Sequence, residues 1–381
     1  MEENIKTNKV KYISMFSLAM TLVGCFIGVG SSTGREIMTY FGNFGKMGIV
    51  GIFISIGILV TLFTYMAFVT ARNMGTTQFD YVSTPFGWKP LRIFCLYFSL
   101  IGLSSSICAM IAGSGAILSA LFGIPYVVGA GLMTLLCLFT VVLSLEKFAN
   151  LMGGMITVMC VAAITICLVC IISPASEGGG GWDKVVSNSE LIGNWFTSSL
   201  IYWGFAVGPQ IQLIVSMSNK IKDKKTAATA SIVCSVVLVI VAICVATAIV
   251  FNYDICSSAA MPTVTLGYAK FPVFGIIYGI VAMIAIYSTM TGFLFIFKEI
   301  FDKKIPALHK DSKKLVLVLF LLLAVCFGLS FIGYANFVDT IWAYLAFVGY
   351  IFKVGLIINF FYYRKHPKNR DTVVDNAEML P

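Results

Sequence analysis

The chain has 381 residues, of which 59% are hydrophobic and only 11% charged, and its mean hydropathy is +0.94. Soluble domains are about 45–50% apolar and about 25% charged, so this composition excludes a soluble protein and predicts an all-α polytopic membrane protein. The net charge of +9 reflects lysines and arginines between apolar segments. No basic run with interleaved aromatic residues is present, which excludes nucleic acid as an expected partner.

Apolar runs long enough to cross a bilayer recur along the whole chain. A crossing helix needs about 20 mostly apolar residues. Ten segments meet this length: 14–41, 47–71, 91–121, 125–145, 151–173, 194–217, 227–251, 272–299, 315–333 and 338–362. With the N-terminus inside, the cytoplasmic loops and tails hold 21 of the 26 lysines and arginines, and the outer side holds four. This asymmetry predicts a plasma-membrane protein with both termini in the cytoplasm.

The ten segments divide into two halves of five. The predicted organisation is a cytoplasmic N-terminus (1–13), a first five-helix half (14–173), an extracellular loop (174–193), a second five-helix half (194–362) and a cytoplasmic tail (363–381). Nearly all of the eleven cysteines lie in apolar runs, so we expect neither a disulfide framework nor a zinc site.

Two of the segments are interrupted at corresponding positions of the two halves. Segment 14–41 contains VGCFIGVGSSTGREIM, in which four glycines precede a pair of charges. Close helix packing through Gly24-x-x-x-Gly28 is one explanation. However, segment 194–217, the first of the second half, is also interrupted, at Gly208 and Pro209. Paired interruptions of this kind are typical of inverted-repeat transporters and mark their binding site.

The longer run VGCFIGVGSSTGREIMTYFGNFG resembles the helix-1 signature of the YkvI-like bacterial membrane proteins. These proteins belong to the amino acid–polyamine–organocation superfamily, whose members have the LeuT fold. The resemblance covers most of the chain in length, helix number and orientation, although its motif is specific only in helix 1. It implies a LeuT-like 5+5 inverted repeat of about ten transmembrane helices with helices 1 and 6 broken, and it does not identify a substrate.

The resemblance also implies where a small-molecule substrate binds. In LeuT-like transporters the unwound part of helix 1 offers backbone groups, and the following half-helix suits a carboxylate. The matching residues are Gly28, Val29, Gly30, Ser31 and Ser32. Trp203, Phe205 and Gln210 near the second interruption, with Ser105, are further candidates by position. The alternatives are hydroxyls that bond to their own helix and aromatic rings that pack or face lipid.

A candidate sodium site lies in segment 272–299. Ala285, Ser288 and Thr289 share one helix face, so a carbonyl and two hydroxyl oxygens can converge on a hard cation. The spacing resembles half of the sodium site widespread in this superfamily, which the carbonyls of Gly24 and Ile27 would complete. Local bonding of the hydroxyls within their helix is again the alternative. Segment 151–173 has no acid or base apart from cysteines, and neither histidine lies in a span, which favours sodium over protons.

Three charged residues form a candidate extracellular gate: Arg35, Glu36 and Asp339. In sodium symporters of this fold an arginine on helix 1 pairs with an acid on helix 10, but here Arg35 stands one position later than that spacing predicts. An ordinary salt bridge is the alternative. Lys353 lies inside the last span, about three turns before the basic tail, and we expect it to extend to the cytoplasmic surface.

These features predict a secondary transporter that carries a small amino acid or related solute by sodium-coupled symport, with alternating access. Sodium is the expected coupling ion, and no other cofactor is expected. Two alternatives stay open: proton coupling or exchange through Glu36, and a ligand sensor that does not transport. An enzyme is not expected, because no HExxH or GxSxG motif and no pair of buried acids occurs in the spans. The expected partners are the substrate and the lipid bilayer, and the sequence allows a monomer or a homodimer.

Overall fold

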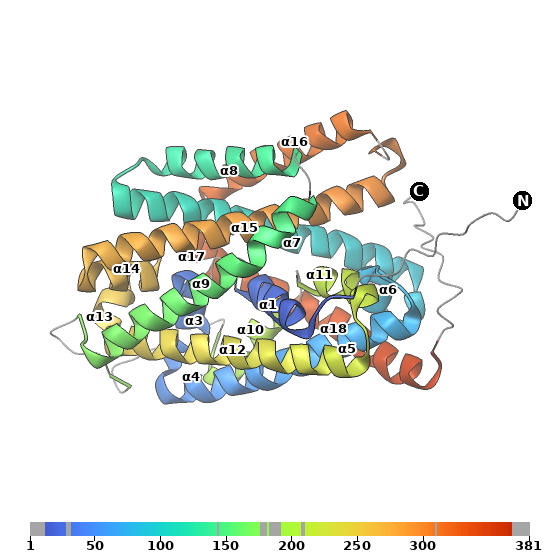
Figure 1. The fold of residues 1–381 in the computed structure, drawn as a ribbon, viewed down its shortest axis with the longest axis horizontal. Helices are drawn as coiled ribbons and strands as arrows, with labels where there is room; N and C mark the ends of the chain where they lie inside the picture. The colour runs from blue at the N-terminus through green and yellow to red at the C-terminus, as the bar shows by residue number, and fades with distance from the viewer. Residues whose placement is uncertain are drawn as a thin grey trace, which may run out of the picture.

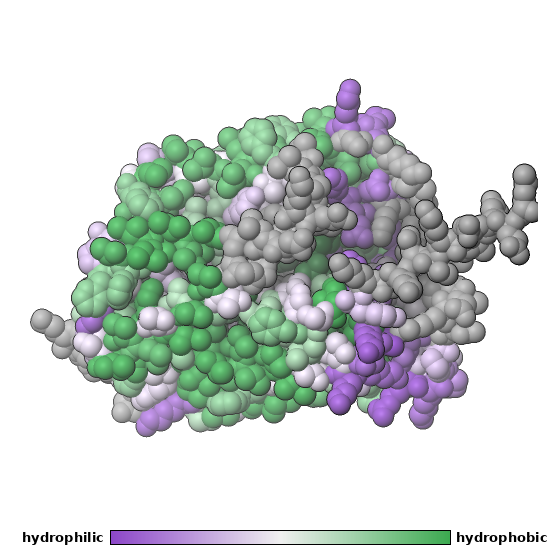
Figure 2. Space-filling view, in the orientation of Figure 1, coloured by the Kyte–Doolittle hydropathy of each residue, from purple (hydrophilic) through white to green (hydrophobic). Residues whose placement is uncertain are grey.

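The structure is a computed structural model that describes residues 12–27, 32–142, 145–175, 181–182, 192–206, 210–308 and 311–367. Long helices run side by side along the longest axis of the molecule (Figure 1). Apolar residues cover most of the face drawn in Figure 2, whereas hydrophilic residues gather toward the end of the bundle where α6 is labelled in Figure 1. The all-helical, multi-pass membrane fold predicted from composition is confirmed.

The first half follows the first five predicted segments. Its helices are α1 (Met15–Phe26), α3 (Arg35–Tyr40), α4 (Gly45–Ile52), the π-helical η2 (Phe53–Val60), α5 (Thr61–Met74), α7 (Lys89–Phe122), α8 (Tyr126–Val142) and α9 (Leu145–Ile172). Short elements connect them: η1 (Gly42–Phe44), α6 (Phe79–Val82) and η3 (Pro85–Gly87).

The second half follows the other five. Its helices are α10 (Trp195–Ala206), α11 (Gln210–Ser216), α12 (Lys224–Phe251), α15 (Pro272–Lys304), α16 (Ser312–Ser330), α17 (Tyr334–Asn336), the π-helical η6 (Phe337–Ile341) and α18 (Trp342–Lys365). The connectors are η4 (Ser218–Lys220), α13 (Tyr253–Cys256), α14 (Pro262–Lys270) and η5 (Pro306–Leu308).

Six helices of the described chain are long and apolar enough to cross a membrane, and the bent pair α10 and α11 adds a seventh. Three shorter apolar helices, Met15–Gly24, Tyr126–Thr140 and Ile156–Ile172, fall within the remaining predicted segments. The number of about ten crossings and the orientation of the termini stay predictions. The two ends of the bundle are called here the α13 end and the α6 end, after the connectors that lie there (Figure 1).

Small residues let the helices approach closely, as is common where apolar burial does not drive association. A Cβ atom on Gly24 would lie 2.0 Å from the Cδ1 atom of Ile156, so α1 packs tightly on α9 at this point. A Cβ atom on Gly204 would lie 2.7 Å from the Cβ atom of Ala346, which brings α10 against α18. For Gly24, the packing explanation of the glycine-rich run therefore holds.

The connectors contain structure that the hydropathy pattern does not predict. Helices α13 and α14 fill the stretch between α12 and α15, where α14 begins with Pro262 in its first turn, a position that suits proline. At the other end of α12, Asp223 caps the helix by accepting from the backbone N–H of Thr226 at 2.6 Å. This bond holds the pKa of Asp223 below its usual value of 3.8.

Candidate functional site

The first helical break lies between α1 and α3. Helix α1 ends at Phe26, and the hydroxyl of Tyr278 on α15 donates to the carbonyl of Ser32 beyond the break. The Thr33 hydroxyl lies 3.1 Å from that of Tyr334. Ser32 is buried, as predicted substrate residues should be. The other predicted residues of this break, Gly28, Val29, Gly30 and Ser31, lie outside the described residues.

Gly34 is the N-cap residue of α3. Its backbone has a φ of +80°, which L side chains rarely adopt. A Cβ atom here would also lie 2.2 Å from the Thr263 hydroxyl oxygen and 3.2 Å from the Thr263 amide nitrogen. Glycine is therefore required twice, for the turn and for the close approach of α14.

The second break separates α10, which ends at Ala206, from α11, which begins at Gln210; the two are bent by 49°. The last carbonyls of a helix have no partner within it. One of them, the Gly204 carbonyl, accepts a hydrogen bond from Nζ of Lys353 on α18. Gly208 and Pro209 lie outside the described residues.

The expectation that Lys353 extends to the cytoplasmic surface is wrong. The residue is only 3% exposed, and its ammonium lies 5.0 Å from the ring centre of Trp203, 5.6 Å from that of Tyr350 and 5.8 Å from that of Phe63. A Cβ atom on Gly349 would lie 2.8 Å from the Gly204 carbonyl oxygen. Because residue 349 is glycine, α10 comes so close to α18 that Lys353 reaches the broken helix.

The other residues predicted near the second break fall into two groups. Phe205 stacks on Trp342, with ring centres 4.3 Å apart, and the Trp342 indole N–H donates to the Ser105 hydroxyl at 3.1 Å. Phe205 and Ser105 therefore both contact Trp342, a residue that the sequence analysis did not single out. Gln210 and its neighbour Gln212 are buried, and Oε1 of Gln210 and both amide atoms of Gln212 have no hydrogen-bond partner among the described residues. Such groups call for a ligand or water.

The candidate sodium residues of α15 bond locally. The hydroxyls of Ser288 and Thr289 both donate to the Ala285 carbonyl, at 2.9 and 3.0 Å, and both residues are buried. A hydroxyl that donates one hydrogen bond keeps its lone pairs for a cation. Gly24 lies against α9, and Ile27 closes the last turn of α1 through a bond to Val23. The sodium site stays a prediction.

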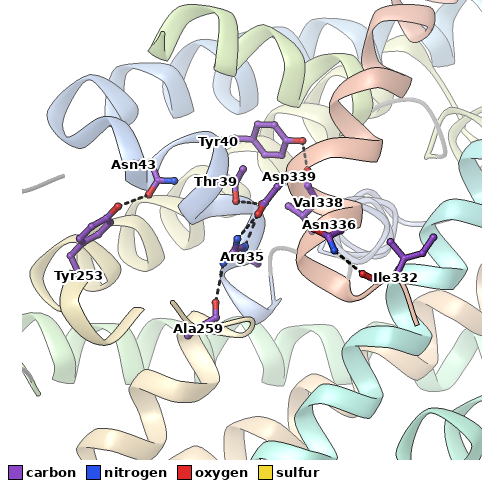
Figure 3. Close-up of polar contacts among 10 residues, drawn as sticks. All are labelled: Arg35, Thr39, Tyr40, Asn43, Tyr253, Ala259, Ile332, Asn336, Val338 and Asp339. Carbon is purple, nitrogen blue, oxygen red and sulfur yellow. Dashed lines mark hydrogen bonds and ion pairs between the residues drawn. The ribbon is translucent and has the colours of Figure 1, made fainter. Parts of the chain in front are cut away.

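Arg35 and Asp339 meet at the α13 end of the bundle (Figure 3). The Arg35 guanidinium pairs with both carboxylate oxygens of Asp339, with Nε 3.3 Å from Oδ1, and donates to the Ala259 carbonyl at 3.1 Å. The Thr39 hydroxyl donates to the same carboxylate at 2.7 Å. The two charged side chains are 14% and 32% exposed, so this contact is near solvent. Glu36, predicted with them, is buried on α3.

A second ionic cluster, which the sequence analysis missed, closes the α6 end. Asp80 on α6 lies 3.2 Å from Arg92 on α7 and 3.6 Å from Lys304 on α15. All three residues are buried. The Asn359 side chain on α18 donates to backbone carbonyls next to this cluster, at 2.7–3.2 Å: those of Tyr81, Val82 and Thr84. The charges were visible in the sequence, but hydropathy gave no sign that they converge.

Two broken helices, α1 with α3 and α10 with α11, are typical of the LeuT-like fold, and solved structures of that fold align with this chain. MhsT in complex with L-phenylalanine aligns with a TM-score of 0.61 and 11% identity, over 93% of this chain and 99% of that one. Mhp1 in its inward-facing conformation aligns with a TM-score of 0.62 and 14% identity, over 93% of this chain and 81% of that one. A mutant manganese transporter of Eremococcus coleocola aligns with a TM-score of 0.52 and 14% identity, over 97% of this chain and 92% of that one.

One curated relative is similar to the chain over nearly its whole length. The chain is 23% identical over 372 residues to YkvI of Bacillus subtilis (strain 168), an uncharacterized membrane protein, covering 94% of this chain and 98% of the relative. The resemblance predicted from the helix-1 run is thereby confirmed. No family model matches the sequence.

Proposed function

We propose that the protein is a secondary transporter that carries a small amino acid or related solute by sodium-coupled symport. The observation that carries this proposal is the pairing of the two helical breaks in one fold. Backbone groups freed in a membrane must be satisfied by protein, water or a bound solute. At the second break, Gln210 and Gln212 present buried amide atoms that lack partners among the described residues.

One of the two similarities that follow supports an amino acid as the solute. One structure with this fold holds L-phenylalanine, and another is of a manganese transporter. In this chain the stacked rings of Phe205 and Trp342 provide an apolar surface near the second break. A neutral amino acid with an apolar side chain combines a carboxylate for the helix-1 backbone with a surface for these rings.

The ionic contacts at the two ends suit alternating access. A transporter opens its central site to one side of the membrane while the other side stays closed. The Arg35–Asp339 contact is partly exposed, so it can break and reform as a gate at the α13 end. The buried cluster around Asp80 would be the corresponding closure at the α6 end.

Sodium coupling is proposed from Ser288 and Thr289. The test is the melting temperature of the purified protein against a panel of amino acids and amines, each in sodium and in potassium. A ligand that binds the folded state raises the melting temperature. We expect one solute to stabilise only in sodium, and Ser288→Ala to weaken that effect. Ser231→Ala is the matched control, because Ser231 is buried and bonds to its own helix at 2.9 Å.

Equal stabilisation in both salts would contradict sodium coupling and favour proton coupling through Glu36. In that case solute uptake would depend steeply on pH, and Glu36→Gln would remove the dependence. Solute binding without flux into liposomes would instead identify a membrane ligand sensor.

A further inference from the structure

A small cavity of about 50 Å³ lies beside the second break, apart from the predicted sodium residues. Elements α5, α6, α7, α10, α11 and α18 surround it. Its walls are mostly apolar and include Phe63, Phe98, Ile211 and Phe352. Lys353 is the one charged residue in this lining.

The ammonium of Lys353 is incompletely satisfied. It has three N–H donors, of which one bonds to the Gly204 carbonyl and the others face aromatic rings and the cavity. No carboxylate in the described part of the chain forms an ion pair with it. Charging a buried lysine that has no counter-ion is costly, so an anion that enters this cavity and pairs with Lys353 favours its charged form and gains a strong interaction.

The cavity has room for more than one water molecule. A water needs about 10–15 Å³ of such space, so about 50 Å³ holds several waters or one small organic ion. Part of the space exists because residue 102 on α7 is glycine: a Cβ atom there would meet no other atom within 4 Å.

We propose that this cavity is an anion site that binds a short-chain monocarboxylate. The carboxylate pairs with the free N–H donors of Lys353, and the alkyl group lies against Phe98 and Phe352. A single positive charge matches a monoanion, and apolar walls favour an ion with an apolar part over sulfate or phosphate. The cavity shares Phe205 with the proposed substrate surface. The inference nevertheless goes beyond the proposed function, because it requires neither sodium nor the residues of the first break.

Propionate is the probe for this site. The melting temperature of the purified full chain is measured with propionate, propionamide, propylammonium and chloride, at constant pH, sodium concentration and ionic strength. We expect a rise that saturates with propionate and no rise with the neutral amide or the cation. An equal rise with propionamide, or none with propionate, overturns the proposal.

Two variants remove the site through residues of different helices, α18 and α7. Lys353→Met keeps the length of the side chain and removes its charge, and Gly102→Val fills the cavity without changing Lys353. Both should lose the propionate shift. Gly292→Val is the matched control, because a Cβ atom on Gly292 also meets nothing within 4 Å and Gly292 does not line the cavity. A shift that survives in Gly102→Val overturns the proposal even if Lys353→Met fails to fold. The readout is propionate binding at constant sodium. If propionate does not bind, the result of the sodium-dependent solute test is therefore unaffected.

Discussion

The two helical breaks expose backbone carbonyls to the same membrane interior, yet their carbonyls are satisfied by different chemistry. At the first break the neutral hydroxyl of Tyr278 donates to the Ser32 carbonyl. At the second, the ammonium of Lys353 donates to the Gly204 carbonyl. A hydroxyl satisfies a carbonyl at small desolvation cost, whereas burying an ammonium costs much more. A neutral donor would have sufficed at the second break, and the anion site proposed above is the role that would require a lysine there.

The largest expected loss of stability is at the first break, where Gly34→Ala places a side chain on a left-handed backbone. The backbone strain costs about 1–2 kcal/mol and the overlap with Thr263 about 1–3 kcal/mol, for a total loss of about 2–5 kcal/mol. Unfolding in detergent measures it. Gly292→Ala is the control, since α15 has open space there and alanine favours a helix. Equal stability of the two variants would show that Gly34 is not required.

Removing the neutral donor should have a smaller effect. Tyr278→Phe leaves the buried Ser32 carbonyl without this partner, so the free energy of unfolding should fall by about 1–3 kcal/mol. The same unfolding measurement applies, with Tyr344→Phe on the exposed face of α18 as a control that should change little. A stable Tyr278→Phe protein would mean that the bond does not support the first break.

Of the two hydrogen-bond donors, Tyr278 and Lys353, the lysine should be the one whose removal changes the free energy of unfolding less. Lys353→Met also leaves a carbonyl without its donor, but it eliminates a buried cation that has no counter-ion among the described residues. Exchange of a buried charge for an apolar side chain is often neutral or stabilising, so we expect a free energy of unfolding within about 1 kcal/mol of the wild type, or above it. A loss as large as that of Tyr278→Phe would show that Lys353 acts only as a cap.

Asp223, which caps the N-terminus of α12, provides a third comparison, outside the predicted spans. The Thr226 backbone amide lowers the pKa of Asp223, so the ionised cap stabilises the fold above the ordinary pKa of 3.8 and loses this contribution as pH falls through the lower folded-state pKa. Asp223→Asn keeps an acceptor that does not titrate. The small difference in melting temperature between wild type and variant should shrink below about pH 4. A difference that stays constant across this range would contradict the assignment.

Composition predicted the membrane class, because apolar segments recur along the whole chain. The paired interruptions indicated an inverted-repeat transporter, and the resemblance of the helix-1 run implied the LeuT-like fold. The helix-1 run also placed Arg35 and Asp339 as a pair, through the resemblance, and the two are in contact. Their role as a gate stays a prediction.

Features that depend on helix packing could not be predicted. The spacing of Lys353 from the basic tail allowed a surface position, but only the approach of Gly204 and Gly349 decides which way it lies. Trp342 bonds to Ser105, which lies 237 residues earlier in the chain, and stacks on Phe205. Nothing in the sequence distinguishes Trp342 from other aromatic residues in spans. The Asp80 cluster likewise joins the α6 connector to the distant end of α15.

The most direct test of the central claim is uptake into liposomes that contain the purified protein. The solute found by thermal stabilisation is supplied outside, with an inward sodium gradient in one sample and potassium in the other. The account predicts accumulation above the outside concentration in sodium alone. Binding of that solute without flux in either salt would contradict a transporter and identify a sensor with this fold.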